Sequence, residues 1–170
     1  MKLYLMRHGP AEDHADSGMD SDRSLTASGR ERVRGVAKLL VELDEQPLQV
    51  VTSPLVRAVQ TAEIIALVTK LGDREGSVEV RRELSPGGGG GAGLVTSLAA
   101  AGSKRVMLVG HEPDLSELLA ILTPKGSSHP FDKAMVIGLH VGPSGDHSRL
   151  RFVLDPRSLK LDPDHRGSGL

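Results

Sequence analysis

Short apolar runs alternate with amphipathic segments along most of the chain. Each run is too short for a helix and stops at a breaker or a polar residue, which is typical of a buried strand. The runs that predict strands cover residues 3–6, 48–52, 78–80, 106–109, 133–141 and 150–154. Segments with helical periodicity predict helices over 27–45, from 53 to about 72, from 94 to about 102, and over 113–122. This alternation predicts one α/β domain.

Capping residues and chain breakers indicate where the predicted helices begin and end. Thr26 is placed to cap the first helix, and Pro47 ends it. Ser53 followed by Pro54 is typical of a helix start. We interpret Glu112 as complementing the dipole of the helix that starts at residue 113.

Two stretches show neither a helical periodicity nor the apolar run of a buried strand. Five glycines, residues 87–91, lack the lysine and Ser/Thr ending of a P-loop and the spacing of a dinucleotide fingerprint. We therefore interpret them as a flexible linker or mobile loop. Residues 155–170 are polar and contain two prolines, which predicts a loose C-terminal tail.

Composition narrows the class of protein. The 170 residues suit one domain with a real core. With 2% aromatic residues and a formal net charge of −1, the chain lacks the stacking platforms and basic face of a nucleic-acid-binding protein. It has no cysteine, which excludes thiolate nucleophiles and cysteine-ligated zinc. No signal peptide or membrane span is visible, so we expect a cytoplasmic protein without a membrane partner.

Three of the predicted strands are followed by a cation or an imidazole. Arg7 and His8 end the first strand. Arg57 lies in the helical turn after the second, and His111 follows residues 106–109. Singly, each is more typical of a solvated strand end or a surface arginine. If the strands are parallel neighbours, however, their carboxyl ends meet at one edge of the sheet. Guanidiniums and helix amides gathered there suit a dianionic phosphoryl group, and clustered cations favour a neutral imidazole.

Four motifs, in this order, resemble the histidine phosphatase superfamily, which includes the cofactor-dependent phosphoglycerate mutases. They are Arg7-His8-Gly9, Leu25-Thr26 with Gly29, Ser53-Pro54-x-x-Arg57-Ala58-x-Gln60-Thr61-Ala62, and Gly110-His111-Glu112-Pro113. The resemblance covers residues 1–141. The chain is short and has no helical insertion between the third and fourth of these motifs, so it looks most like the SixA-type phosphohistidine phosphatases. It implies a three-layer α/β/α sandwich with a mostly parallel central sheet, phosphoglycerate mutase-like, as a single domain over residues 1–154.

The resemblance also implies roles for the four side chains. His8 would be the nucleophile that forms a phosphohistidine. Arg7, Arg57 and His111 would hold the phosphoryl oxygens and stabilise the transition state. Water would then hydrolyse the intermediate, with no metal or organic cofactor. The histidines outside these motifs show no ligand spacing, so no metal site is predicted.

The group that protonates the leaving group is the least defined part of the predicted site. Many family members that cleave phosphate esters carry an acidic residue between the third and fourth of these motifs, where Glu83 is the nearest candidate. A solvated glutamate beside Arg81 and Arg82 is an equal alternative. Further candidates in the loop after the nucleophile are Glu12, Asp13 and His14.

Three functions therefore stay open at this point. The first is a protein phosphohistidine phosphatase, whose leaving imidazole needs little help once it is protonated. The second is a phosphomonoesterase or mutase of small phosphorylated metabolites, with Glu83 as general acid. The third is a phosphate-binding protein without turnover. The expected partner is a phosphorylated protein histidine or a small phosphorylated metabolite, and neither nucleic acid nor membrane.

Overall fold

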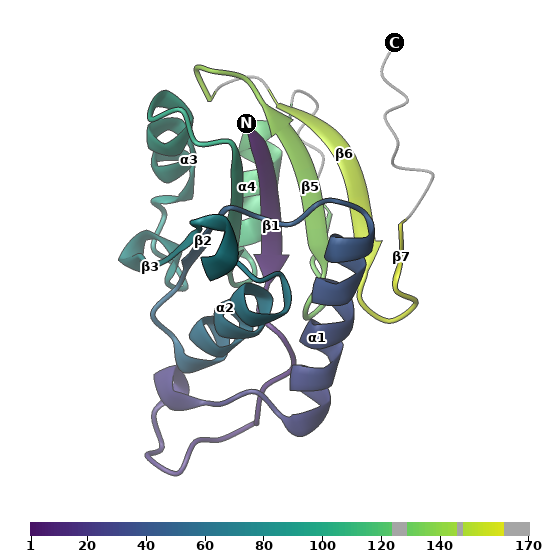
Figure 1. The fold of residues 1–170 in the computed structure, drawn as a ribbon. Helices are drawn as coiled ribbons and strands as arrows, with labels where there is room; N and C mark the ends of the chain where they lie inside the picture. The colour runs from purple at the N-terminus through teal and green to yellow at the C-terminus, as the bar shows by residue number, and fades with distance from the viewer. Residues whose placement is uncertain (124–128, 146–147, 162–170) are drawn as a thin grey trace.

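The computed structural model describes residues 1–123, 129–145 and 148–161, which contain a seven-stranded sheet of order β3-β2-β4-β1-β5-β6-β7 (Figure 1). The strands are β1 Lys2–Arg7, β2 Gln49–Thr52, β3 Ser77–Val80, β4 Arg105–Gly110, β5 Val136–Val141, β6 Ser148–Asp155 and β7 Lys160–Leu161. The helices are α1 Ala27–Glu42, α2 Val56–Val68, α3 Gly91–Ala100 and α4 Asp114–Leu122. Short 3-10 turns are η1 Asp20–Asp22, η2 Gly72–Arg74 and η3 Arg82–Leu84.

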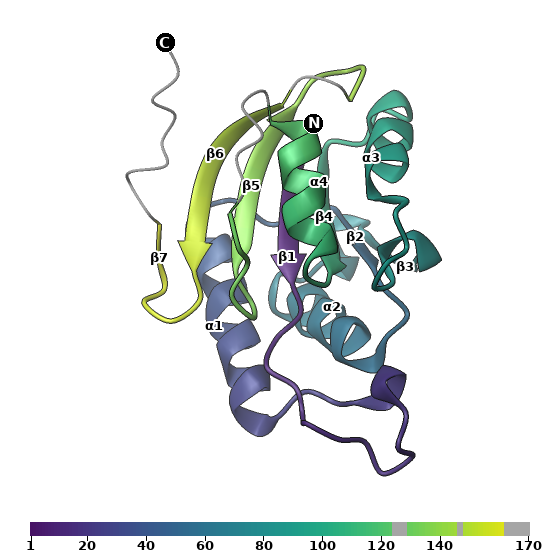
Figure 2. The ribbon, with the colours of Figure 1, turned by 180° about the vertical axis from the view of Figure 1, so that it is seen from behind.

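Helices cover both faces of the sheet, so the three-layer α/β/α architecture is confirmed. Helices α1 and α2 lie on one face (Figure 1), and α3 and α4 lie on the other (Figure 2). Alternate residues of β1 belong to the two cores between these layers. Tyr4 and Met6 pack with α1 and α2, whereas Leu3 and Leu5 pack with α3 and α4. Because both faces of β1 are buried, its sequence is a continuous apolar run.

The sheet is parallel at its core and antiparallel at one side. Strands β3, β2, β4 and β1 are parallel neighbours, and β5, β6 and β7 continue the sheet antiparallel. Because β2 and β1 flank β4, the carboxyl ends of these three strands lie together. The His8 amide donates to the Gly110 carbonyl at 3.1 Å, and the Ser53 amide donates to the Val109 carbonyl at 3.0 Å. The three predicted junctions therefore share one edge of the sheet.

Local contacts determine where the helices begin and end, and the apolar pattern of the sequence does not reveal these contacts. Thr26 caps α1 as predicted, because its hydroxyl accepts a hydrogen bond from the Gly29 amide at 2.9 Å. Helix α1 ends at Glu42, three residues early, since Asp44 turns the chain with φ of 52°. The predicted start of α2 at Ser53 is wrong. That helix begins at Val56, and Ser53 uses its hydroxyl in the site described below.

The glycine run is part of the packed fold, so its interpretation as a linker is wrong. Gly91 is the first residue of α3. The preceding turn closes on η3 with a hydrogen bond from the Gly88 amide to the Ser85 carbonyl at 2.8 Å. The Gly87 amide donates to the Asp114 carboxylate at 3.0 Å, which joins the run to α4. Strands of one sheet lie before and after the run, so it does not separate two units.

The prediction of a loose tail from residue 155 is wrong for residues 155–161. Strand β7 pairs antiparallel with the end of β6, where Leu161 faces Leu154. Leu161 also packs against the core beneath α1 and α2. The rest of the predicted tail, residues 162–170, lies outside the described residues. Within the described ranges, no helix has the length and apolar character needed to cross a membrane.

Candidate active site

His8 lies directly after β1 and is buried. Its Nδ1 is 2.7 Å from the carbonyl oxygen of Gly9. A carbonyl can only accept a hydrogen bond, so Nδ1 carries the proton of the neutral ring. The lone pair is therefore on Nε2, and the Arg57 Nε group donates to it at 3.3 Å. This geometry leaves Nε2 of His8 as the ring nitrogen with an available lone pair.

His111 faces His8 from the end of β4, with the two ring centroids 5.1 Å apart. His111 is buried, and its Nε2 lies 2.8 Å from the Ser53 hydroxyl. Its Nδ1 is buried and has no hydrogen-bond partner among the described residues. An unpaired buried nitrogen costs free energy until another atom supplies its hydrogen bond.

Arg57 lies in the first turn of α2 with 5% of its side chain exposed. Besides its contact with His8, its Nη1 donates to the Asp20 carbonyl at 2.8 Å and its Nη2 to the Asp20 carboxylate at 3.0 Å. Asp20 belongs to η1, in the loop that follows the nucleophile. Asp20 thus connects the loop that follows His8 to Arg57, although the sequence analysis did not predict Asp20 as a site residue.

Arg7 is the last residue of β1, and its Nη1 donates to the Phe131 carbonyl at 2.7 Å. Its Nε is buried and also lacks a partner among the described residues. Phe131 is held in turn by Glu112, whose carboxylate accepts from the Phe131 amide and from the Ser116 hydroxyl at 2.8 Å. Glu112 therefore joins the segment before β5 to helix α4, in addition to its predicted place at the start of that helix.

Both imidazoles are neutral at neutral pH. The pKa of His8 is lowered to about 3, with burial as the largest cause and with His111, Arg57 and Arg7 acting in the same direction. Burial also lowers the pKa of His111 to about 4, with Arg57 as the next cause. The prediction of neutral imidazoles agrees with these directions, but desolvation contributes more than the clustered cations to which we attributed it.

The remaining motif residues hold the backbone of the site. The Thr61 hydroxyl accepts from the Gly9 amide at 3.1 Å and joins α2 to the end of β1. A Cβ atom at Gly9 would lie 2.7 Å from the Val33 side chain, and one at Gly29 would lie 2.0 Å from the Pro10 carbonyl. These glycines let α1 pack directly against the segment that carries His8.

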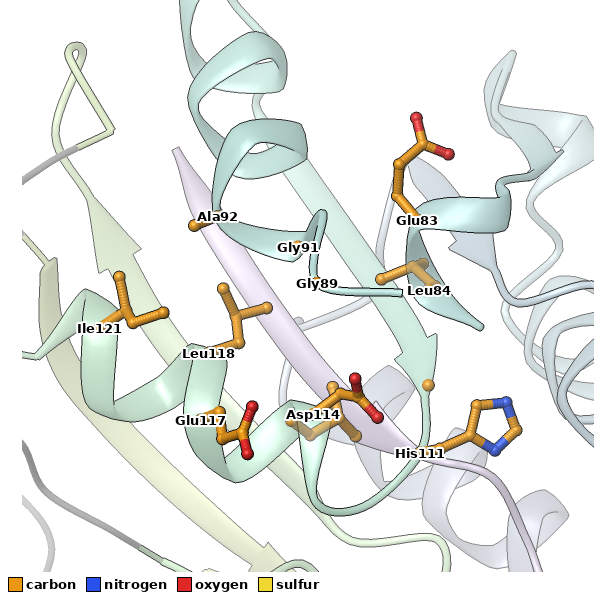
Figure 3. A pocket seen from close by; sticks show the side chains of 12 residues that line it. Glu83, Leu84, Gly89, Gly91, Ala92, His111, Asp114, Glu117, Leu118 and Ile121 are labelled. Carbon is orange, nitrogen blue, oxygen red and sulfur yellow. The ribbon is translucent and has the colours of Figure 1, made fainter. Parts of the chain in front are cut away.

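Glu83 and the loop candidates lie at the margin of the site. Glu83 lines a cleft together with His111 and Asp114, but its carboxylate points away from the His111 ring (Figure 3). The side chain is 44% exposed and lies 3.9 Å from the Arg81 guanidinium. The loop candidates are all exposed; they are Glu12, Asp13 and His14. Among the described residues, no group of three or more potential ligands could hold a metal ion.

Comparisons with known proteins agree with this geometry. The sequence model of the histidine phosphatase superfamily (branch 1) matches residues 3–85. An uncharacterized protein of Picosynechococcus sp. (strain PCC 7002) is 40% identical over 146 residues, which cover 84% of this chain and 86% of that protein. The phosphohistidine phosphatase SixA of Escherichia coli is 29% identical over 163 residues, 95% of this chain and 98% of its own. A solved structure of the protein histidine phosphatase SixA with tungstate has a TM-score of 0.85 at 30% identity, and covers 94% of this chain and 100% of that chain.

Proposed function

This chain belongs to the histidine phosphatase superfamily, and from that premise we propose that it is a phosphatase that works through a covalent phosphohistidine on His8. Its substrate class is a phosphorylated histidine on a protein. The observation that carries the proposal is the lone pair on Nε2 of His8, together with two buried nitrogens that lack partners among the described residues, Arg7 Nε and Nδ1 of the facing His111 ring. A phosphoryl group bound there would give these nitrogens the partners that they lack.

In the first step, Nε2 of His8 attacks the phosphorus atom. A bond forms between Nε2 and phosphorus while the bond from phosphorus to the leaving nitrogen breaks. The electron pair of that bond leaves with the substrate imidazole, which is neutral after departure if its other nitrogen already carries a proton. Arg7, Arg57 and His111 surround the negative oxygens of the transferring group.

In the second step, water attacks the phosphorus atom of phosphohistidine 8. The bond between Nε2 and phosphorus breaks, the lone pair returns to His8, and the proton of the water goes to the released phosphate. Neutral His8 is restored by this step. The low pKa that burial gives to His8 supports this cycle, because a protonated imidazole has no lone pair for the attack.

The test is transfer of a labelled phosphoryl group to the protein. We expect the protein to become labelled at His8 by a phosphohistidine protein, and His8→Ala to abolish both labelling and turnover. His140→Ala is the matched control, because His140 is an exposed residue of β5. Turnover that persists in His8→Ala would exclude the mechanism. Tight phosphate binding without turnover in any assay would favour the non-catalytic alternative.

A second candidate function, hydrolysis of small phosphate esters with Glu83 as general acid, is favoured only by the position of Glu83 along the same cleft as His111. The exposure of Glu83 and the direction of its carboxylate support the phosphohistidine substrate instead, because a phosphoramidate with a protonated leaving group does not need an acid. We expect Glu83→Gln to change turnover of a phosphohistidine protein less than twofold. A loss of about a hundredfold on an alkyl phosphate alone would indicate an ester enzyme.

A further inference from the structure

A cleft leads away from His111 along helix α4. Figure 3 shows His111 at one end of the cleft and Ile121 at the other. Residues 114 and 121 are seven positions apart on α4, which corresponds to about 10 Å along the helix axis. Its apolar lining includes the buried side chains of Leu84 and Leu118 and, at the far end, Ile121, which is 67% exposed. A phosphoryl group alone would not reach this far.

The glycine run keeps the cleft open. A Cβ atom at Gly91 would lie 3.1 Å from the Leu118 side chain across the cleft, and one at Gly90 would lie 2.8 Å from Cβ of Glu83. The Asp114 carboxylate holds the run in place by accepting hydrogen bonds from the Gly87 amide at 3.0 and 3.2 Å. The absence of side chains in this run therefore leaves an apolar surface accessible beside the site.

The charged side chains that line the cleft are all carboxylates. Glu83 lies on the η3 wall, and Asp114 and Glu117 lie on the α4 wall (Figure 3). None of the described residues that line it is a lysine or an arginine. A leaving group with a carboxylate or a second phosphate would meet like charge there, which opposes binding. A group with a cationic and an apolar side chain would meet opposite charge and an apolar surface.

We propose that this cleft, lined by Leu84, Leu118, Ile121 and the three carboxylates, binds the protein segment that carries the phosphohistidine. The segment would place an apolar side chain over Leu118 and Ile121 and a lysine or arginine near Glu117. This inference rests on the proposed function, because it assigns the substrate of the same site. It goes beyond that function by stating which residues must flank the phosphorylated histidine.

The test compares two phosphohistidine peptides that share their apolar residues. One carries two lysines beside the histidine, and the other carries two glutamates. The readout is kcat/KM for each peptide, with phosphoramidate as a small reference substrate. We expect the lysine peptide to exceed the glutamate peptide by about tenfold at low salt, and the difference to shrink as salt is added.

Charge reversal in the cleft locates the effect. We expect Glu117→Lys to reduce the ratio between the two peptides by about fivefold or more. Glu63→Lys is the matched control, since Glu63 is an exposed residue of α2 on the opposite face of the sheet, and it should not alter the ratio. Ile121→Ser should lower kcat/KM for both peptides relative to phosphoramidate, because it removes apolar surface from the cleft without adding charge.

The outcomes separate this inference from the proposed function. Equal kcat/KM for the two peptides, a preference for the glutamate peptide, or the same response to Glu117→Lys and Glu63→Lys would overturn the inference and leave the phosphatase intact. Failure to hydrolyse either peptide would overturn the proposed substrate class, and the inference with it.

Discussion

At the scale of single residues, the two arginines of the site are held by different kinds of partner. Arg57 is fixed by the carboxylate and carbonyl of Asp20, whereas Arg7 is fixed by the carbonyl of Phe131. The position of the Phe131 carbonyl depends on the backbone of that residue. Glu112 fixes this backbone by accepting a hydrogen bond from the Phe131 amide. Under the proposed function, Glu112 would act on the phosphoryl group through Arg7 without touching that group itself.

We expect Glu112→Ala to weaken binding of orthovanadate or inorganic phosphate by about tenfold, because Arg7 loses its fixed position. The measurement is a double-mutant cycle with Arg7→Ala. If Glu112 acts through Arg7, the Glu112→Ala substitution should have little further effect on oxyanion affinity once Arg7 is absent. Additive losses in affinity would contradict this. Glu112→Gln, which keeps an oxygen acceptor, should recover most of the affinity, and Glu117→Ala on the same helix serves as the control.

The two buried imidazoles also make a prediction about pH. The folded-state pKa values of about 3 for His8 and about 4 for His111 lie below the ordinary value of 6.5. The unfolded chain therefore binds more protons than the folded chain below pH 6.5, so stability falls as pH falls from 6.5 toward 4. Each imidazole lowers the free energy of unfolding by about 1.4 kcal/mol per pH unit in that window.

Histidine resonances measured by NMR between pH 8 and 5 check this directly. We expect the resonances of His8 and His111, assigned from His8→Ala and His111→Ala, to stay at their neutral positions throughout. A midpoint above pH 6 for His8 would contradict the burial argument.

The sequence predicted that Arg7, His8, Arg57 and His111 lie at one edge of the sheet, but it did not predict the partners of these side chains. Each of the four follows an apolar run, and parallel strands end at one edge. Asp20 lies in a segment with no period, and its contact with Arg57 depends on how that loop closes in three dimensions. Ser53 has the sequence signature of a helix cap, yet its hydroxyl contacts His111 from another strand.

At the scale of elements, one glycine of the run and one glycine of helix α3 should respond oppositely to the same substitution. A Cβ atom at Gly90 would lie 2.8 Å from Cβ of Glu83, whereas nothing lies within 4 Å of one at Gly93. Gly93 is exposed and inside α3. We expect Gly90→Ala to lower the free energy of unfolding by about 1–3 kcal/mol through overpacking against η3. Gly93→Ala should raise it by about 0.5–1 kcal/mol through helix propensity.

Urea denaturation of the two variants and the wild type measures both shifts. Similar shifts of the same sign would show that the run does not pack against η3 in solution. The control variant is Ser97→Ala in α3, which is exposed and tests helix propensity without a change at glycine.

The strand boundaries were predicted most accurately where the apolar run is continuous. The buried strands β1 and β4 were predicted to within a residue at each end, because both of their faces are covered and their apolar runs are continuous. The strand predicted over 133–141 begins only at Val136. Ala134 is apolar and buried but has φ of 71°, and its amide donates to the carbonyls of Arg7 and His8 instead of joining a ladder. Apolar character predicts burial there, and it does not distinguish a strand from a buried turn.

At the scale of the whole molecule, β1 connects two clusters of polar groups at opposite ends of the sheet. His8 and the phosphoryl site follow its carboxyl end, while Lys2 lies at its amino end, about 17 Å away along the strand. At the amino end, the Glu45 carboxylate accepts from Tyr4 Oη at 2.7 Å, Lys2 Nζ at 3.1 Å and Arg151 Nη1 at 2.9 Å. Glu45 therefore joins β1 and β6 to the segment after α1.

Glu45 and its three donors lie far from His8, so we expect that stability can be changed there without a change in catalysis. Burial by itself would raise the pKa of Glu45, but hydrogen bonds from Arg151, Tyr4 and Lys2 outweigh it and lower that pKa to about 2. Because the folded-state pKa lies below the ordinary value, the stabilisation is present above pH 4.5 and is lost as pH falls toward 2. We expect Glu45→Gln to lower the free energy of unfolding at pH 7 by about 2–3 kcal/mol, and the difference from wild type to shrink below pH 4.

Denaturant unfolding at pH 7 and pH 3, together with phosphoramidate turnover well below the unfolding temperature, tests both parts of this expectation. Asp44→Asn is the matched control. Its carboxylate is 84% exposed, so loss of its ion pair with Arg105 should cost less than about 0.5 kcal/mol. Turnover by Glu45→Gln should stay within twofold of wild type, because the cluster contacts none of the four side chains at the carboxyl ends. A large loss of turnover with little loss of stability would mean that the two ends of β1 are coupled, and that the position of His8 depends on contacts at the far end of its strand.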